Sequence, residues 1–388
     1  MIRVGYIYDK ICTIENIRQA HQCARRDKLF YKEVKMVDAN PEHYFKLIQE
    51  MLLTHTYNVG EYIVEIINES GKDRTLMKLP YYPDRIIQWA IILQIEPYLT
   101  RTFTFHTCAS LPGRGQDRCI KLTETYLRDV EATQYCLKID IHHFYPSIDR
   151  TILKERLRRI FKDPDLLWLL DIIIDSPPGD VGIPIGSYLS QYLANFYLTP
   201  LDHLIKEVFH FKDVVRYMDD MIILCNSKQR LQFFLHNNLM FILEKYYHLE
   251  LKGNYQIFPV DARGIDFCGY VFYHGYTRLR RGTKERMETR MIELRSKYEN
   301  GRMISEHDFG TFNAYQGILT HCDSFHLWEK YMEPVIPAIE EYRRKHKMKE
   351  YTIHPKFERK LNLNMVQDDN DLIYEQMALI NDPDSVAE

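Results

Sequence analysis

The chain has 388 residues, of which 45% are hydrophobic and 13% aromatic, a composition that excludes a disordered polymer and fits two or three packed subdomains. The formal charge of −3 excludes a uniformly basic protein, so any nucleic-acid contact must come from local clusters of charge. No apolar stretch approaches the roughly 20 residues of a membrane span and the first residues do not resemble a signal peptide, so we expect a soluble, cytoplasmic protein with no membrane partner. Eight cysteines without a Cys-x-x-Cys motif are expected to be reduced thiols.

Residues 1–60 are predicted to form a helical extension without a chemical motif, because apolar residues such as Tyr44, Leu47 and Ile48 recur at helical spacing. Two strands are then expected, over 62–67 and 76–79, on either side of a polar turn that carries Lys72 and Arg74.

The segment Pro83–Ala90 opens an amphipathic helix that continues to Tyr98. A glycine-rich turn follows at Leu111–Gly115, where the backbone can approach a ligand closely and Arg114 can reach a phosphate. A plain surface turn is the alternative for that segment.

The segment Cys136–Asp149 begins as a short apolar strand, ends on the carboxylate of Asp140 and continues into the aromatic pair Phe144 and Tyr145. A buried helix is predicted over 165–175, from its run of leucine and isoleucine.

The segment Gly182–Gln191 is a glycine-punctuated loop that leads into a helix, with Ser187 placed to cap the helix N-terminus. Gly186 allows the loop backbone to approach a substrate.

In the segment Val215–Leu224, Asp219 and Asp220 interrupt an apolar, β-rich run. We expect a tight hairpin with both carboxylates at its tip, because a charge pair inside a buried strand is costly. Carboxylates held on strand ends suit Mg²⁺, which prefers oxygen ligands. An Asp-Asp turn without a ligand is the alternative, since Asp is a common turn residue.

The order of these three segments resembles the palm of reverse transcriptases, with Asp219 lying 219 − 140 = 79 positions after Asp140. The resemblance implies an α+β right-hand polymerase whose palm is an antiparallel sheet backed by helices. It implies the following division of the chain: 1–60, N-terminal helical extension; 61–135, fingers; 136–275, palm, with finger elements at about 150–180; 276–345, helical thumb; 346–388, a basic and then acidic tail.

The same resemblance implies two-metal nucleotidyl transfer. Asp140 and Asp219 would bridge two Mg²⁺ ions, with Asp220 and the backbone carbonyl of Ile141 in support. Tyr145 occupies the position of the steric gate that selects dNTPs over NTPs; a simple core aromatic is the alternative.

Four further positions take their roles from the resemblance. Arg74 would clamp the triphosphate of the incoming dNTP, and Lys252 would lie near the pyrophosphate leaving group, with a solvated lysine as the alternative. Arg114 would contact the template, and Gly269 would lie in the hairpin 264–273 that supports the primer 3′ end.

The C-terminal third contains the clusters of charge. Residues 278–302 hold nine Lys or Arg against four Glu, and the last 28 residues, 361–388, hold seven Asp or Glu and no Lys or Arg. We expect Arg280, Arg281 and Lys284 to follow the phosphate backbone of the primer and template.

The segment that contains Ile185, Gly186 and Gln191 resembles the reverse transcriptases of diversity-generating retroelements. An aliphatic residue stands where retroviral and group II intron enzymes carry Gln, and the motif ends in Ser-Gln. The resemblance implies that Ile185, Gly186 and Gln191 bind the incoming dNTP. That subgroup copies a template-repeat RNA into cDNA with errors at adenines, and the cDNA replaces a variable repeat. Its members act with a small basic, oligomeric accessory protein. The alternatives are a phage-defence or other orphan bacterial reverse transcriptase, or a non-catalytic RNA-binding protein on a polymerase-like palm.

Overall fold

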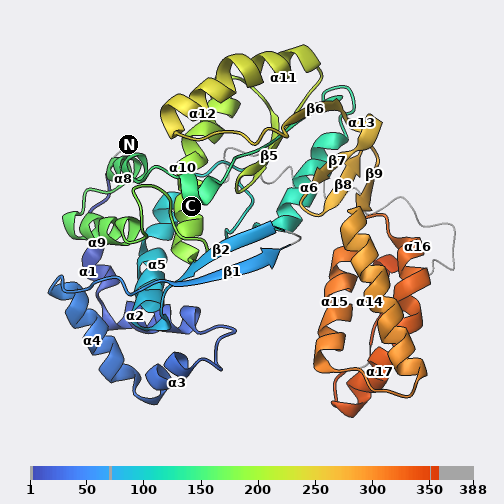
Figure 1. The fold of residues 1–388 in the computed structure, drawn as a ribbon, viewed down its shortest axis with the longest axis horizontal. Helices are drawn as coiled ribbons and strands as arrows, with labels where there is room; N and C mark the ends of the chain where they lie inside the picture. The colour runs from blue at the N-terminus through green and yellow to red at the C-terminus, as the bar shows by residue number, and fades with distance from the viewer. Residues whose placement is uncertain (1–2, 70–71, 350, 358–388) are drawn as a thin grey trace, which may run out of the picture. The chain divides into compact units, whose positions relative to one another are not determined.

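The computed structural model describes residues 3–69, 72–349 and 351–357. The chain divides into two compact units, Met1–Thr277 and Arg278–Glu388; Figure 1 shows the elements of each. The acidic stretch 361–388 lies outside the described residues. Among the described helices, none has the length and apolarity that a membrane crossing requires.

The first unit begins with the helices that the periodicity of residues 1–60 predicts. These are α1 (Tyr8–Ile11), α2 (Ile14–Ala24), α3 (Lys32–Ala39) and α4 (Pro41–Leu53). Thr13 caps α2, because its hydroxyl accepts a hydrogen bond from the backbone N–H of Asn16. Ile17, Phe45 and Ile48 are fully buried, so these helices pack through one apolar face.

The strands β1 (Ile63–Glu69) and β2 (Lys72–Lys78) form an antiparallel hairpin. The ladder is longer than the sequence indicated, because residues 68–69 and 72–74, which we expected to belong to a turn, are paired in it. Arg74 lies within β2 opposite Ile67 and not at the turn itself.

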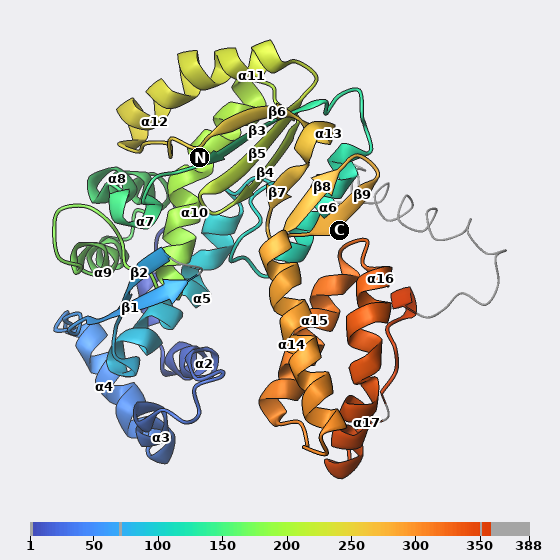
Figure 2. The ribbon, with the colours of Figure 1, turned by 45° about the vertical axis from the view of Figure 1, so that its right-hand side comes forward.

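A four-stranded antiparallel sheet occupies the centre of the first unit, in the order β4-β5-β3-β6 (Figure 2). Its strands are β3 (Tyr135–Asp140), β4 (Asp213–Tyr217), β5 (Asp220–Cys225) and β6 (Gln256–Pro259). Alternate residues face opposite sides. Leu137, Ile139 and Ile223 share one face and belong to the apolar core. The other face carries Lys138, Asp140 and Asp220.

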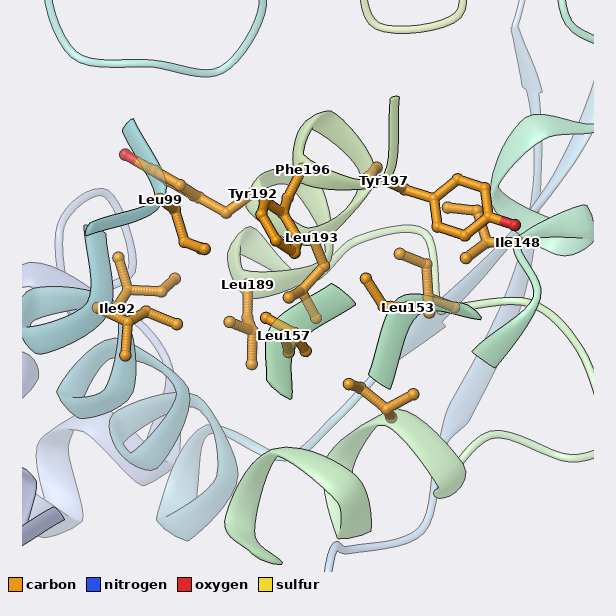
Figure 3. Close-up of a cluster of buried hydrophobic side chains, with 14 of the residues drawn as sticks. Ile92, Leu99, Ile148, Leu153, Leu157, Leu189, Tyr192, Leu193, Phe196 and Tyr197 are labelled. Carbon is orange, nitrogen blue, oxygen red and sulfur yellow. The ribbon is translucent and has the colours of Figure 1, made fainter. Parts of the chain in front are cut away.

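The apolar core lies between the helices α5 (Ile86–Thr100), α8 (Arg150–Ile160) and α10 (Tyr188–His203). Figure 3 shows side chains of these helices pointing toward one another: Ile92, Leu99, Leu153, Leu157, Leu189, Tyr192, Leu193, Phe196 and Tyr197. Because twelve of the sixteen residues of α10 are buried, that helix provides a fixed support for the sheet.

The remaining elements of the first unit surround this sheet and core. They are η1 (Tyr81–Arg85), α6 (Gln116–Leu127), α7 (Phe144–Ser147), α9 (Pro164–Asp175), η2 (Leu204–Val208), α11 (Lys228–Phe234), η3 (Leu235–Leu239), α12 (Met240–Tyr247) and α13 (Val260–Arg263). A second sheet has the order β7-β8-β9, with β7 (Ile265–Phe267), β8 (Tyr270–Tyr273) and β9 (Tyr276–Leu279).

The second unit is helical over its described residues. It contains α14 (Arg281–Glu299), α15 (Glu306–Thr320), α16 (Phe325–Leu327), η4 (Trp328–Met332), η5 (Glu333–Val335), α17 (Ile336–Lys345) and η6 (Pro355–Phe357). Met287, Phe312 and Trp328 form part of its buried interior, and Ser305 and Asp308 form a capping box at the start of α15.

Antiparallel sheets backed by helices confirm the predicted α+β fold class. All eight cysteines are free thiols and six of them are buried, as expected for reduced core residues.

Candidate active site

The hairpin between β4 and β5 turns over two residues, because Tyr217 pairs directly with Asp220. Its tip therefore holds Met218 and Asp219, and Asp220 is the first residue of β5, which corrects the expectation that both carboxylates lie at the tip. Met218 has a left-handed backbone with φ of 57°. Glycine is the usual residue at such a position, so surrounding contacts must stabilise this turn.

Arg216 supplies those contacts from inside the sheet. Its guanidinium donates to the carbonyl of Met218 at 2.9 Å and to the side-chain oxygen of Asn195 at 3.0 Å. It also forms two hydrogen bonds with the carboxylate of Asp202, at 2.8 and 2.5 Å. The side chain of Arg216 is only 1% exposed. Its ion pair with Asp202 ties the strained hairpin to α10.

The strand register brings the three carboxylates to one end of the sheet. Asp140 pairs with Asp220 across β3 and β5, so the two side chains lie on the same face. The backbone N–H of Ile141 donates to the carbonyl of Asp219 at 3.3 Å. The structure thus joins Asp140, Ile141, Asp219 and Asp220, which the sequence places in two segments 79 residues apart.

The electrostatics of Asp219 follow from its surroundings. Burial raises the pKa of its carboxyl group, and the neighbouring charge of Asp140 raises it further, whereas Lys252 and Arg74 act to lower it. The ammonium of Lys252 forms an ion pair with the carboxylate of Asp140. Lys138 lies 3.7 Å from Asp220. The three carboxylates therefore place negative charge at this end of the sheet. The cations of Lys252, Lys138 and Arg74 offset part of that charge.

Two divalent ions are the cofactor that the sequence predicts here. In the described part of the chain, no three His, Cys, Asp or Glu side chains converge closely enough to hold a metal ion as they stand. The donor set nevertheless fits Mg²⁺, because all of its side-chain donors are carboxylate oxygens and the raised pKa of Asp219 shows a carboxylate that a cation would stabilise.

Tyr145 lies beside the hairpin, as a gate residue would. Its hydroxyl contacts the sulfur of Met218 at 3.6 Å, and burial raises the pKa of its phenol, with the charge of Asp219 adding to the effect. The carbonyl of Tyr145 accepts a hydrogen bond from the N–H of Ile183 at 3.0 Å. Tyr145 therefore connects the hairpin with the glycine-punctuated loop.

The loop that holds Ile185 and Gly186 is fixed at both ends, and Gln191 follows it in the first turn of α10. The carbonyl of Ile185 accepts a hydrogen bond from the N–H of Met77 in β2 at 3.1 Å. This bond ties the glycine-punctuated loop to the β1–β2 hairpin. Ser187 caps α10 as predicted, and its hydroxyl donates to Gln88 at 2.8 Å. Gly186 is exposed and has φ of 114°, a conformation that favours glycine.

Arg114 lies just before α6, and Gly269 lies in the β7–β8 turn, where the carbonyl of Cys268 accepts a hydrogen bond from the side chain of Gln116 at the start of α6. Arg114 donates to the carbonyls of Thr104 and Thr107, both at 2.8 Å, so its guanidinium binds its own loop. Cys268 and Gly269 form the two-residue turn between β7 and β8, both with positive φ. A contact of either residue with nucleic acid stays a prediction.

Arg281 and Lys284 lie in the first turn of α14 and pair with acidic residues one turn later. Arg281 contacts Glu285 at 2.7 Å and Lys284 lies 3.7 Å from Glu288. Arg280 precedes the helix as its N-cap residue. The predicted basic track is therefore partly balanced by its own helix.

Two arginines are important for the geometry and received no role in the sequence analysis. Arg216 is one, and Arg150 is the other: its buried guanidinium donates to the carbonyls of Gly179, Val181 and Gly182 and so shapes the glycine-punctuated loop. The role of Arg216 could have been inferred from its place inside the apolar stretch Val214–Tyr217, since a buried charge needs a partner.

Residues 66–254 match the family model described as reverse transcriptase (RNA-dependent DNA polymerase). This segment, which is just under half of the chain, is therefore similar to a reverse transcriptase domain. The match includes Asp140, Asp219 and Asp220, and it agrees with the predicted enzyme class, an RNA-directed DNA polymerase.

Individual relatives of the reverse transcriptase domain are distant. Protein YkfC of Escherichia coli strain K12 is 24% identical over 263 residues, which cover 65% of this chain and 62% of YkfC. The chain thus spans less than two thirds of that curated relative.

Two solved structures of telomerase are similar to the chain. Apo telomerase from Candida Tropicalis matches with a TM-score of 0.48 and 12% identity, covering 75% of this chain and 59% of that one. Telomerase from Candida albicans in complex with a TWJ fragment of telomeric RNA matches with a TM-score of 0.44 and 10% identity, covering 77% and 65%.

Proposed function

We propose that this reverse transcriptase is the polymerase of a diversity-generating retroelement. It copies a template-repeat RNA into cDNA with errors at adenines, and the cDNA then replaces a variable repeat. The observation that carries the proposal is Ile185, which stands in the glycine-punctuated loop beside Gly186. A glutamine there can hydrogen-bond the incoming nucleotide, whereas isoleucine offers only apolar contact, so discrimination between nucleotides weakens.

The proposed reaction joins the primer 3′-hydroxyl to the α-phosphate of a dNTP and releases pyrophosphate. Two Mg²⁺ ions held by Asp140 and Asp219, with Asp220 and the carbonyl of Ile141 in support, would supply the positive charge that stabilises the transition state.

The chain's own side chains bind and orient the dNTP. Arg74 contributes positive charge near Asp219 and is suited to the triphosphate. The ring of Tyr145, next to Met218, excludes a 2′-hydroxyl. Lys252, which is paired with Asp140, is the ammonium that can transfer a proton to the departing pyrophosphate.

The proposal extends to a partner. Polymerases of this kind act with a small basic, oligomeric accessory protein, and this chain has a formal charge of −3 and an acidic C-terminal sequence that suits such a protein.

The test is an error spectrum of the cDNA that the wild type and Ile185→Gln make on one primed RNA with Mg²⁺. We expect an excess of errors opposite template adenine in the wild type, and about tenfold fewer in the variant, which corresponds to a gain of about 1.4 kcal/mol in discrimination. A wild type with no excess at adenine contradicts the assignment and points to another bacterial reverse transcriptase. An excess that is unchanged in the variant shows that the infidelity lies elsewhere, with Arg74 the next residue to test.

A further inference from the structure

Three cysteines from separate segments meet beside the β4–β5 hairpin. Cys108 lies in the loop before α6, Cys119 lies within α6, and Cys268 lies in the turn between β7 and β8. The sulfurs of Cys119 and Cys268 are 3.1 Å apart, and a hydrogen bond also joins the side chains of Cys119 and Cys108. The backbone N–H of Cys108 donates to the carbonyl of Arg216 at 2.9 Å, which places the cysteines next to the active-site hairpin.

Neighbouring hydrogen bonds hold Cys119 and Cys268 against each other. At the start of α6, the side chain of Gln116 donates to the carbonyl of Cys268. Toward the end of the same helix, the carboxylate of Glu124 accepts a hydrogen bond from the hydroxyl of Thr277 at 2.7 Å. One bond therefore lies on each side of Cys119 along α6, so the fold keeps the two thiols in contact.

The two thiols differ in their access to solvent. Cys119 is fully buried, and burial raises the pKa of its thiol. Cys268 is only partly buried, so a small oxidant in solution reaches Cys268 first. An accessible thiol next to a second cysteine that can resolve its oxidised form is the arrangement common in redox sensors.

We propose that Cys119 and Cys268 form a reversible disulfide when hydrogen peroxide oxidises the protein. The sulfur of Cys268 attacks the peroxide, which breaks the O–O bond, converts Cys268 to a sulfenic acid and releases water. The thiol of Cys119 then attacks that sulfur. Its proton leaves with the hydroxyl group as a second water, and the S–S bond forms. The two thiols together lose the pair of electrons that the peroxide gains.

The disulfide makes the position of the β7–β8 turn depend on the redox state. The turn and α6 move toward each other when the bond forms, because bonded sulfurs lie about 1 Å closer than these two thiols do. Gly269 belongs to the same turn, which the proposed function assigns to the support of the primer 3′ end. The functional part of the inference rests on that proposed function: a displaced turn holds the primer less well, and primer extension slows.

The first test is chemical and needs no catalysis. The full chain is treated with hydrogen peroxide, its remaining thiols are alkylated, and its peptides are identified by mass spectrometry with and without dithiothreitol. We expect the peptide that contains Cys119 to be linked to the one that contains Cys268, and dithiothreitol to release it.

The variant Cys119→Ser should lose this link, and Cys268→Ser provides the same test at a partly exposed position if the first variant does not fold. The matched control is Cys23→Ser, which replaces the other partly exposed cysteine and should keep the link. Oxidation of Cys268 to a sulfinic acid without a link would overturn the inference, and so would a disulfide that joins Cys119 to Cys108 instead.

The second test compares primer extension by the reduced and the oxidised chain on one primed RNA. We expect oxidation to slow the wild type on the order of tenfold, dithiothreitol to restore the rate, and Cys119→Ser to show no such reversible change. Equal inhibition of that variant, or an unchanged rate in the cross-linked wild type, would overturn the redox control of the turn. A chain that forms the link but extends no primer retains the disulfide and loses the proposed function, so the two proposals fail separately.

Discussion

The β4–β5 hairpin and helix α14 both carry charged residues that the sequence marks as functional, but they hold those charges in different ways. In the hairpin, Arg216 is buried and its side-chain partners Asp202 and Asn195 come from α10. Asp140 pairs with Asp220 across strands that are distant in sequence. In α14, Arg281 and Lys284 face solvent and pair with residues four positions away. Long-range contacts fix the first set, whereas local pairs worth about 0.3–0.5 kcal/mol each balance the second. Substitutions in the hairpin should therefore have much larger effects.

The largest effect is expected from Asp219→Asn. The substitution keeps the shape of the side chain and removes the charge that Mg²⁺ requires, so primer extension should fall by orders of magnitude. The thermal unfolding midpoint should not fall, because the native carboxyl group has a pKa raised by burial and pays a desolvation penalty. A variant that retains substantial polymerisation would contradict the assigned site.

The second-largest effect is expected on the free energy of unfolding, from the substitution Arg216→Met. Arg216→Met leaves Asp202 buried without its cation and frees the carbonyl of Met218, so the free energy of unfolding should fall by about 3–5 kcal/mol. Urea unfolding measures it. The control is Arg216→Met/Asp202→Asn, which removes both charges and should recover part of the loss. If the double variant is no more stable than the single one, the ion pair is not what supports the hairpin.

A smaller and more selective effect is expected from Tyr145→Ala. The ring lies against Met218 at the hairpin tip, and its removal opens space for a 2′-hydroxyl. The ratio of kcat/KM for dNTP to that for NTP should fall while DNA synthesis continues. Tyr145→Phe keeps the ring and should keep the ratio. An unchanged ratio in the alanine variant would mean that Tyr145 is a core aromatic and not the gate.

The smallest effect is expected in α14. Neutralising Arg281 and Lys284 together should change the free energy of unfolding by less than about 1 kcal/mol, because both side chains are exposed and pair with residues of their own helix. Binding to primer–template should nevertheless weaken and its log–log salt slope should fall by about 0.9 for each lost phosphate contact to duplex. A slope that does not change would mean that this face binds another partner, such as a protein.

The sequence predicted the parts of the site that depend on local pattern. The apolar strand that ends on Asp140 and the capping serine at 187 can be predicted from neighbouring residues, and the structure places each in the expected element. The hairpin tip was placed one residue too late, because the pairing of Tyr217 with Asp220 depends on strand register.

The rest depends on contacts between distant segments. Nothing near Arg216 in the sequence identifies Asp202 or Asn195 as its partners, and nothing near Cys119 indicates that it meets Cys268. Propensity also understated the β1–β2 ladder, since polar residues such as Asn68 and Asp73 pair in strands when the opposite strand supplies the hydrogen bonds.

The central claim is that the carboxylates at the end of this sheet make DNA from an RNA template. The most direct measurement is the sequence of the product that the purified chain makes from a primed RNA, dNTPs and Mg²⁺, with Asp219→Asn as the control. We predict DNA complementary to the RNA from the wild type and no extension from the variant. A folded wild type that binds the primed RNA but adds no nucleotide would contradict the claim and would leave an RNA-binding protein on a polymerase palm.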